Sequence, residues 1–303
     1  MNTTAAVIVT YNRRALLKEC LSAVLLQTAA CDVLIIDNHS TDGTGEMMKE
    51  LMVSREETPD GDERDITYLN TGANLGGSGG FSFGMKEAVK RGYEYLWIMD
   101  DDCVPEKDCL EKLLLAGDSL KGDYGFLASR VVWTDGSLCS MNIPRDSLNH
   151  RLTKFGKDPK KIVIASFVSM LIPAERIREV GLPIKEFFIW VDDWEYARRI
   201  SKRYGCYLVP DSVAVHKTAN NDGADIIAAE GSSIDRYRYM YRNSVYFYRQ
   251  EGLYGRVYLV GRTALHLIKV LLHSKHDKLR KCRLIIGSTL EGLRFNPEID
   301  YVQ

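Results

Sequence analysis

The run Leu96-Trp97-Ile98-Met99-Asp100-Asp101-Asp102-Cys103 places three consecutive carboxylates directly after an apolar segment long enough to form a buried strand. Adjacent like charges repel each other, and a divalent cation is the usual compensation in proteins. Oxygen ligands of this kind favour Mg²⁺ or Mn²⁺ over zinc. Taken alone, the run fits an exposed acidic loop equally well, with an N-cap for a helix starting near Pro105, so both interpretations stay open at this point.

The segments before this run predict a mostly parallel α/β sheet. Ala5 to Thr10 and Cys31 to Ile36 read as short buried strands, and helical spacing follows each, over 15–27 and about 44–54. Strand and helix in this alternation predict right-handed crossovers, and ligands bind beyond the carboxyl ends of such strands. The side chains expected at that edge, together with Asp100, are Thr10, Tyr11, Asp37 and Asn38.

A charged insert and a glycine-rich stretch follow. Arg55 to Asp65 is polar throughout and predicts a surface loop, and Ile66 to Leu69 reads as a third strand. Asn74 to Phe81 has four glycines in five positions before a helix expected over about 81–91. Such a loop could expose backbone N–H groups to a diphosphate at the helix N-terminus, although a flexible Gly/Ser loop is the alternative. The spacing is neither a P-loop nor a Rossmann fingerprint.

A second acidic pair, Asp192-Asp193, lies between Trp190 and Trp194 where a helix should begin. Capping of that helix would account for one carboxylate. Aromatic side chains also line sugar sites, and a carboxylate among them can act as a general base. His216 ends a strand predicted over 207–216; a lone histidine is more often structural, but this one ends a strand as Asp100 does.

Composition restricts the function classes. The chain has 303 residues and a net charge of −1, which argues against a nucleic-acid binder with a dominant basic field. Its seven cysteines are scattered without C-x-x-C spacing, so neither a zinc site nor a disulfide framework is predicted. The N-terminus lacks a basic region and there is no apolar span of about 20 residues. We therefore expect a cytoplasmic protein that is soluble or attached to a membrane surface.

The last quarter of the chain combines cations with apolar residues. Residues 236–249 alternate arginines and aromatics, which suits a packed helix as well as a nucleic-acid stacking groove, and overall neutrality favours the helix. Residues 256–283 carry eight Lys and Arg around an apolar run that includes Leu265, Leu267, Ile268, Val270, Leu271 and Leu272. This composition suits an interfacial helix on anionic lipid and, equally, a capping helix or a dimer surface.

Taken together, these motifs resemble the inverting, nucleotide-sugar-dependent glycosyltransferases of the GT-A fold, over Val7 to about Gln250. Val7 to Asn12 and Ile36 to Gly43 look like that family's two nucleoside-binding segments. The glycine stretch, the three aspartates, the segment Phe188 to Tyr196 and the spacing to His216 look like the bacterial galactofuranosyltransferase branch. The resemblance implies a GT-A domain over 1–250, and we expect a basic amphipathic helical extension over 251–303.

The resemblance also implies roles for individual residues. Thr10, Tyr11 and Asp37 would hold the uracil and ribose, with Asn38 where many relatives have a second aspartate. Asn74, Gly76, Gly77, Gly79 and Gly80 would flank the diphosphate, and Asp101 would lie near the donor sugar. Asp100, Asp102 and His216 would bind Mn²⁺ or Mg²⁺. Asp193 would be the catalytic base, with Asp192 beside it for substrate hydroxyls and Trp190 shifted by one place because of Val191.

The expected reaction is metal-dependent, inverting transfer of galactofuranose from UDP-galactofuranose onto a glycan or lipid-linked glycan, at the inner face of the cell membrane. A rhamnosyltransferase using dTDP-rhamnose is the alternative within the same class. A nucleotidyltransferase or a nucleotide-sugar-binding protein is the alternative from another class. The sequence leaves a homo-oligomer open.

Overall fold

The first hundred residues form the parallel half of a central sheet. In the computed structural model, which describes residues 2–57 and 64–302, four strands lie side by side in the order β3-β2-β1-β4, all parallel. They are β1 (Thr4–Thr10), β2 (Asp32–Asp37), β3 (Ile66–Asn70) and β4 (Tyr95–Asp100). The strand that ends in Asp100 therefore lies next to the strand that ends in Thr10, as the pattern predicts.

The second half of the sheet is mixed. Beyond β4 the order is β8-β6-β9-β5, with β7 paired to β9, and only β6 and β9 are parallel in this half of the described sheet. These strands are β5 (Cys103–Pro105), β6 (Leu127–Val132), β7 (Lys160–Lys161), β8 (Met170–Pro173) and β9 (Tyr207–His216). The short β5 returns from the acidic run and pairs with β9, which brings the end of β9 beside the aspartates.

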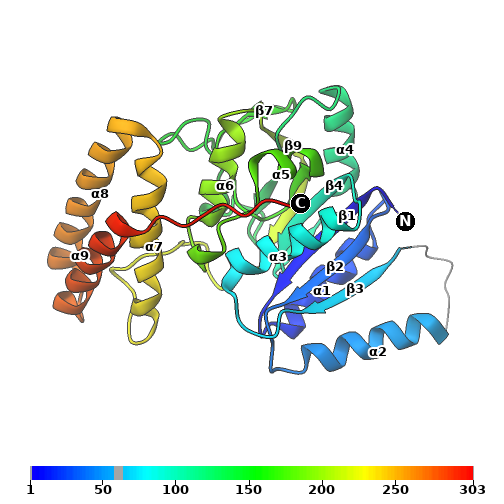
Figure 1. Cartoon of the computed structure of the whole chain (residues 1–303), viewed down its shortest axis with the longest axis horizontal. Coiled ribbons are helices and arrows are strands. Elements are labelled where there is room, and N and C mark those ends of the chain that lie inside the picture. Colours follow the sequence, from blue (N-terminus) through cyan, green and yellow to red (C-terminus); the bar gives the residue numbers. More distant parts are fainter. Residues whose placement is uncertain (1, 58–63, 303) are drawn as a thin grey trace.

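Helices cover both faces of the sheet, which confirms the α/β class (Figure 1). Side chains alternate along β1: Ala5, Val7 and Val9 face the core under α3, whereas Ala6 and Ile8 face the core under α1 and α4. The helices are α1 (Arg14–Leu25), α2 (Thr44–Glu57), α3 (Gly76–Lys90), α4 (Cys109–Ser119), α5 (Ala174–Val180) and α6 (Asp192–Ser201), with short 3₁₀ turns η1 (Ser140–Asn142) and η2 (Lys185–Phe187). Helix α2 continues into the predicted 55–65 loop, of which 58–63 lies outside the described residues.

The glycine stretch starts a helix, so the predicted glycine loop is wrong. Helix α3 begins at Gly76, not near Phe81. A Cβ on Gly80 would lie 2.6 Å from Val9 Cγ1, and one on Gly84 would lie 2.6 Å from Ile36 Cγ1. These glycines therefore allow α3 to pack directly against β1 and β2, and close helix–sheet packing rather than loop flexibility explains their presence.

Three long helices form a separate unit at one end of the molecule (Figure 1). They are α7 (Ser233–Arg249), α8 (Gly252–His273) and α9 (Lys278–Arg294). The sequence predicted a domain boundary between residues 250 and 251. Such a boundary would separate α7 from α8 and α9, the two helices with which it packs. The chain then returns to the α/β body, where the Leu182 N–H donates to the Asp300 carbonyl at 2.8 Å.

No helix in the described ranges has the length and apolar content needed to cross a bilayer. Six of the seven cysteines are buried, and Cys282 is half-buried.

Candidate active site

The carboxyl ends of β1, β4 and β9 bring the predicted metal ligands together. Asp100, Asp102 and His216 each offer one ligand atom, and these atoms lie within 4.8 Å of one another. The sheet fixes this arrangement, because Cys103 of β5 pairs with His216 of β9 and the Lys217 N–H donates to the Asp102 carbonyl at 2.9 Å. The pairing of β5 with β9 thus holds two carboxylates and one imidazole together although 114 residues separate Asp102 from His216.

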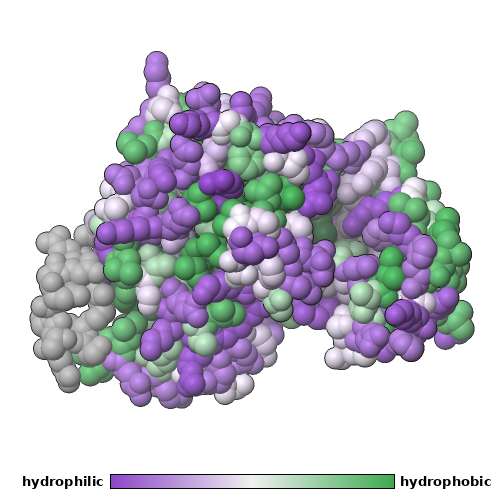
Figure 2. Space-filling view, turned by 180° about the vertical axis from the view of Figure 1, so that it is seen from behind, coloured by the Kyte–Doolittle hydropathy of each residue, from purple (hydrophilic) through white to green (hydrophobic). Residues whose placement is uncertain are grey.

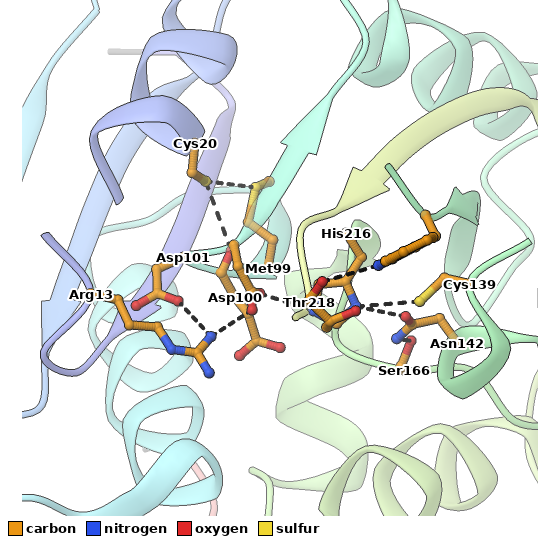
Figure 3. Close-up of polar contacts among 12 residues, drawn as sticks. Arg13, Cys20, Met99, Asp100, Asp101, Cys139, Asn142, Ser166, His216 and Thr218 are labelled. Carbon is orange, nitrogen blue, oxygen red and sulfur yellow. Dashed lines mark hydrogen bonds and ion pairs between the residues drawn. The ribbon is translucent and has the colours of Figure 1, made fainter. Parts of the chain in front are cut away.

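The His216 ring is oriented by groups behind it (Figure 3). Its Nδ1 lies 2.7 Å from Asn142 Oδ1, and the Asn142 amide donates to Ser166 Oγ at 2.8 Å. Donation from Nδ1 to a fixed carbonyl oxygen leaves Nε2 toward the carboxylates, which is the usual arrangement of a metal-binding histidine. Nε2 lies 2.9 Å from Asp102 Oδ1. Asn142 comes from a stretch without periodicity, so no sequence signal identified it.

The electrostatics of the cluster favour a bound cation. Burial raises the pKa of Asp100 to about 8, and the neighbouring Asp102 charge adds to the effect. Burial likewise raises the pKa of Asp101 to about 6. Burial opposes ionisation of Asp102 as well, but hydrogen bonding to His216 and the charges of His216 and Arg13 lower its pKa. Buried carboxylates that repel one another beside an oriented imidazole fit a divalent cation of the Mn²⁺ or Mg²⁺ type.

Arg13 is a site residue that sequence reasoning missed. Its Nη1 lies 2.5 Å from Asp102 Oδ2 and 3.4 Å from Asp101 Oδ1 (Figure 3). The side chain is half exposed, so it reaches the aspartates from the solvent side of the site. The available signal was its position, three residues after Thr10 at the carboxyl end of a strand.

The predicted nucleoside residues cluster at the ends of β1 and β2. The Thr10 hydroxyl donates to Asp101 Oδ2 at 2.7 Å, which links β1 to the acidic run. Asp37 accepts hydrogen bonds from the Ser40 N–H at 2.8 Å and the Tyr68 hydroxyl at 2.5 Å, so protein groups already hold its carboxylate. Tyr11 is exposed at the rim.

Asn38 joins this edge to helix α3. Its amide donates to the Gly76 carbonyl at 3.0 Å, and its Oδ1 is buried without a hydrogen-bond partner in the described part of the chain. A buried acceptor of this kind leaves one polar group free for a ligand at the end of β2.

The N-terminus of α3 is engaged by other parts of the protein. Asn74 Oδ1 accepts from the Gly76 N–H at 2.9 Å, and the Phe188 carbonyl accepts from the Ser78 N–H at 3.1 Å. Gly79 and Gly80 are buried against their neighbours, whereas Gly77 has open space around it. The glycines therefore mainly permit close packing of the acidic Phe188–Asp193 segment and β1 onto α3.

Asp192 and Asp193 form the first turn of α6 after a strained segment. Phe188, Trp190 and Val191 have φ values of 64°, 66° and 70°, which are unusual for residues with bulky side chains. The buried Asn243 of α7 stabilises this segment: its amide lies 2.9 Å from the carbonyls of both Phe187 and Trp190 and 3.2 Å from that of Ile189. The strain therefore persists because a helix from the C-terminal unit holds it.

Asp193, the predicted base, lies in the first turn of α6, where its carboxylate accepts from the Trp194 N–H at 2.8 Å. Burial raises its pKa well above the ordinary value, and the charges of Asp192 and Asp100 add to this effect. Asp100 is thus near enough to Asp193 for its charge to act on that carboxyl group. Trp190 instead packs on Tyr237 of α7, with ring centroids 4.9 Å apart, so its visible contact is with the helical unit.

Comparison with known proteins agrees with this geometry. Residues 5–137 match the family model described as Glycosyl transferase family 2. The chain is 28% identical to galactofuranosyltransferase GlfT1 of Mycolicibacterium smegmatis over 203 residues, which span 64% of each protein, slightly under two thirds of that relative. It is 25% identical to GlfT1 of Mycobacterium tuberculosis over 271 residues, covering 82% of this chain and 83% of the relative.

A solved structure supports the fold assignment. The structure of GalNAc-T7 with UDP, GalNAc and Mn²⁺ superposes with a TM-score of 0.63 at 15% identity, covering 94% of this chain and 54% of that one. At this identity the likeness shows the fold alone. The chain has the GT-A fold, and residues 5–137 match glycosyltransferase family 2; together with the galactofuranosyltransferase relatives, this supports a glycosyltransferase and confirms the resemblance seen in its motifs.

Proposed function

We propose that this glycosyltransferase moves galactofuranose from UDP-galactofuranose, with inversion, onto a hydroxyl of a glycan or lipid-linked glycan. The observation that carries the proposal is one site with two parts. We call the cluster at the strand ends (Thr10, Asp37, Asp100–Asp102 and His216) the donor half. We call the segment 186–191 with Asp192 and Asp193 the acceptor half. The galactofuranosyltransferase relatives support the choice of sugar.

In the donor half, Asp100, Asp102 and His216 would hold the divalent cation. When bound, such a cation neutralises the charge that develops on a departing diphosphate. Thr10 orients Asp101 through its 2.7 Å hydrogen bond, and Arg13 supplies a further positive charge beside both aspartates. These residues position the donor and stabilise its leaving group.

In the acceptor half, Asp193 would take the proton from the acceptor hydroxyl as that oxygen attacks the anomeric carbon. A raised pKa makes the carboxylate a stronger base than a free aspartate. Attack from the face opposite the leaving diphosphate inverts the anomeric configuration and needs no covalent enzyme intermediate. Asp192, buried beside it with its pKa raised to about 6, would contact substrate hydroxyls.

The donor can be tested by measuring UDP or dTDP release with UDP-galactofuranose, UDP-galactopyranose and dTDP-rhamnose, with Mn²⁺, Mg²⁺ or EDTA. We expect turnover with UDP-galactofuranose and loss of turnover in EDTA. Turnover with dTDP-rhamnose alone would identify a rhamnosyltransferase and overturn the choice of donor.

The base can be tested with Asp193→Asn, which should lower the rate of transfer about 10²- to 10⁴-fold while donor binding persists. Asp211→Asn, at an exposed aspartate in β9, is the control and should keep the parent rate. Full transfer by Asp193→Asn would show that another group is the base.

A further inference from the structure

Helix α8 has an apolar face that points away from the protein. Its exposed apolar residues recur every three or four positions, which places them on one side of the helix. The opposite side, which includes Gly255, Leu259 and Val270, packs into the helical unit. The exposed stripe consists of Leu253, Val257, Val260, Leu265, Ile268, Leu271 and Leu272, each at least 49% exposed. Figure 2 shows apolar surface gathered along the outer edge of this unit.

The charge around this stripe has one sign. Residues 252–290 contain eight Lys and Arg and a single acid, Asp277, giving +7, whereas the remaining residues contain 32 Lys and Arg and 40 acids, giving −8. Helix α8 itself has no acidic residue. Arg256 and Lys269 are exposed, flank the stripe on its two sides in the helical projection, and form no ion pair with the described residues. Apolar side chains flanked by unpaired cations match an anionic lipid surface.

Two other occupants fit less well. A membrane-spanning role needs a helix that is both long enough and apolar enough to cross a bilayer, and no helix in the described residues meets both conditions. A two-fold contact between copies of α8 would bring Arg256 and Lys269 of one copy toward the same cations of the other, with no acid on the helix to compensate. An anionic bilayer instead accepts the leucines into its interface and neutralises the cations.

We propose that α8 lies in the interface of an anionic lipid bilayer and docks the protein on that surface. Val270 and Lys281 are among the residues assigned to this segment from sequence that do not take part: Val270 is fully buried, and Lys281 is buried where its ammonium donates to the Ile227 carbonyl at 2.8 Å. The docked face is therefore the stripe from Leu253 to Leu272 with Arg256 and Lys269 at its sides.

The docked helix is close to the chemistry. Helix α7 packs on α8 and also provides Asn243, which holds the segment before Asp192 and Asp193. A bilayer under α8 would thus lie one helix away from the acceptor half. For a lipid-linked acceptor, which rests on the proposed function, the surface that binds the enzyme would also present the substrate.

The test is co-sedimentation of the full chain with vesicles of phosphatidylcholine alone and of phosphatidylcholine mixed with phosphatidylglycerol. We expect binding to the mixed vesicles, weakened by salt. Val260→Gln with Ile268→Gln should weaken it about tenfold or more, and Arg256→Gln with Lys269→Gln roughly 30-fold, from about fivefold per cation.

The matched controls are exposed residues of the α/β body. Leu26→Gln with Leu115→Gln changes two leucines that are 67% and 60% exposed, and Lys90→Gln with Lys121→Gln removes two exposed cations. Both control pairs should bind vesicles as the parent does. No binding to the mixed vesicles, equal binding to pure phosphatidylcholine, or a dimer in light scattering that the Val260/Ile268 variant dissociates would each overturn the proposal. Because the readout is binding, it is independent of the donor sugar.

Discussion

The donor half and the acceptor half of the site are held in different ways. In the donor half, Thr10 at the end of β1 bonds to Asp101 in the acidic run. Asp37 at the end of β2 bonds to Ser40, three residues later in the same turn. The aspartates follow β4 without any residue of the acidic run in the left-handed region. The parallel strands β1, β2 and β4 bring the first of these groups together, and the antiparallel pairing of β5 with β9 adds His216.

The acceptor half depends on a remote element. Three residues with positive φ precede Asp192. Asn243, about fifty residues later, donates to backbone carbonyls in and next to this segment. Arg242 adds a bond to the Phe187 carbonyl at 3.4 Å. A strained segment of this kind keeps its shape only while its surroundings impose it. The comparison predicts that damage to the donor half abolishes cation and nucleotide binding, whereas damage to the Asn243 contact spares binding and impairs transfer.

The largest effect should come from Asp102→Asn. It removes one charge from the cation site and the partner of both Arg13 and His216. We expect kcat/KM to fall ~10³-fold, about 4 kcal/mol of transition-state stabilisation, with weaker Mn²⁺ binding by calorimetry. Asp118→Asn, at an exposed position on α4, should behave as the parent. Unchanged Mn²⁺ affinity in Asp102→Asn would contradict the ligand assignment.

The next effect should come from Asn243→Ala, which removes one donor from each of the carbonyls of Phe187, Ile189 and Trp190. We expect kcat for transfer to fall about 10²-fold, as a misplaced reacting group does, and the free energy of unfolding to fall by about 1–3 kcal/mol.

UDP affinity distinguishes positioning from general damage in Asn243→Ala. It should match the parent, since the donor half makes none of these contacts. Asn296→Ala, at an exposed asparagine, should change neither quantity. If UDP binding and transfer fell together, the two halves would not be independent.

A smaller effect is expected from Asn142→Leu. This change keeps the side-chain size but removes the oxygen 2.7 Å from His216 Nδ1. Loss of such an orienting group lowers metal affinity about 10- to 100-fold. Isothermal titration with Mn²⁺ should show this decrease, and Asn142→Gln should recover part of the affinity. Parent-like affinity in Asn142→Leu would mean that packing alone orients the ring.

The smallest effect is a displaced pH profile. Because burial raises the pKa of Asp193, its basic form appears only as the pH rises through that raised value, so kcat should increase with pH above the ordinary aspartate range. Conversely, a carboxyl with a raised pKa favours the folded state when protonated, and this stabilisation is lost as the pH rises through the folded pKa. Asp193→Glu should move the midpoint of kcat against pH. An unmoved midpoint would assign the titration to another group.

The same contrast explains how far sequence reasoning could go. Strand periodicity and the residues that follow each strand predicted the fold and brought Thr10, Asp37, Asp100 and Asp102 to one edge, because a parallel sheet gives local patterns a definite place in space. The glycine run was predicted to form a loop, but it belongs to a helix. Gly80 is needed there because α3 packs against Val9, a contact that periodicity does not encode. The resemblance implies that Tyr241, Arg242 and Asn243 close the site, but Asn142 and the contacts that Asn243 makes were not predicted, because both act on residues more than fifty positions away.

The pairing of Cys103 with His216 also constrains the order in which the protein folds. The family match ends at residue 137, with Asp100 and Asp102 already in place, yet the third ligand arrives only with β9. A chain emerging from the ribosome can therefore assemble its parallel strands early, but it cannot complete the proposed cation site until more than two hundred residues have been made. A ligand that binds groups on both β5 and β9 stabilises the pairing of these two strands. The site is therefore complete only after β9 has paired with β5, late in folding.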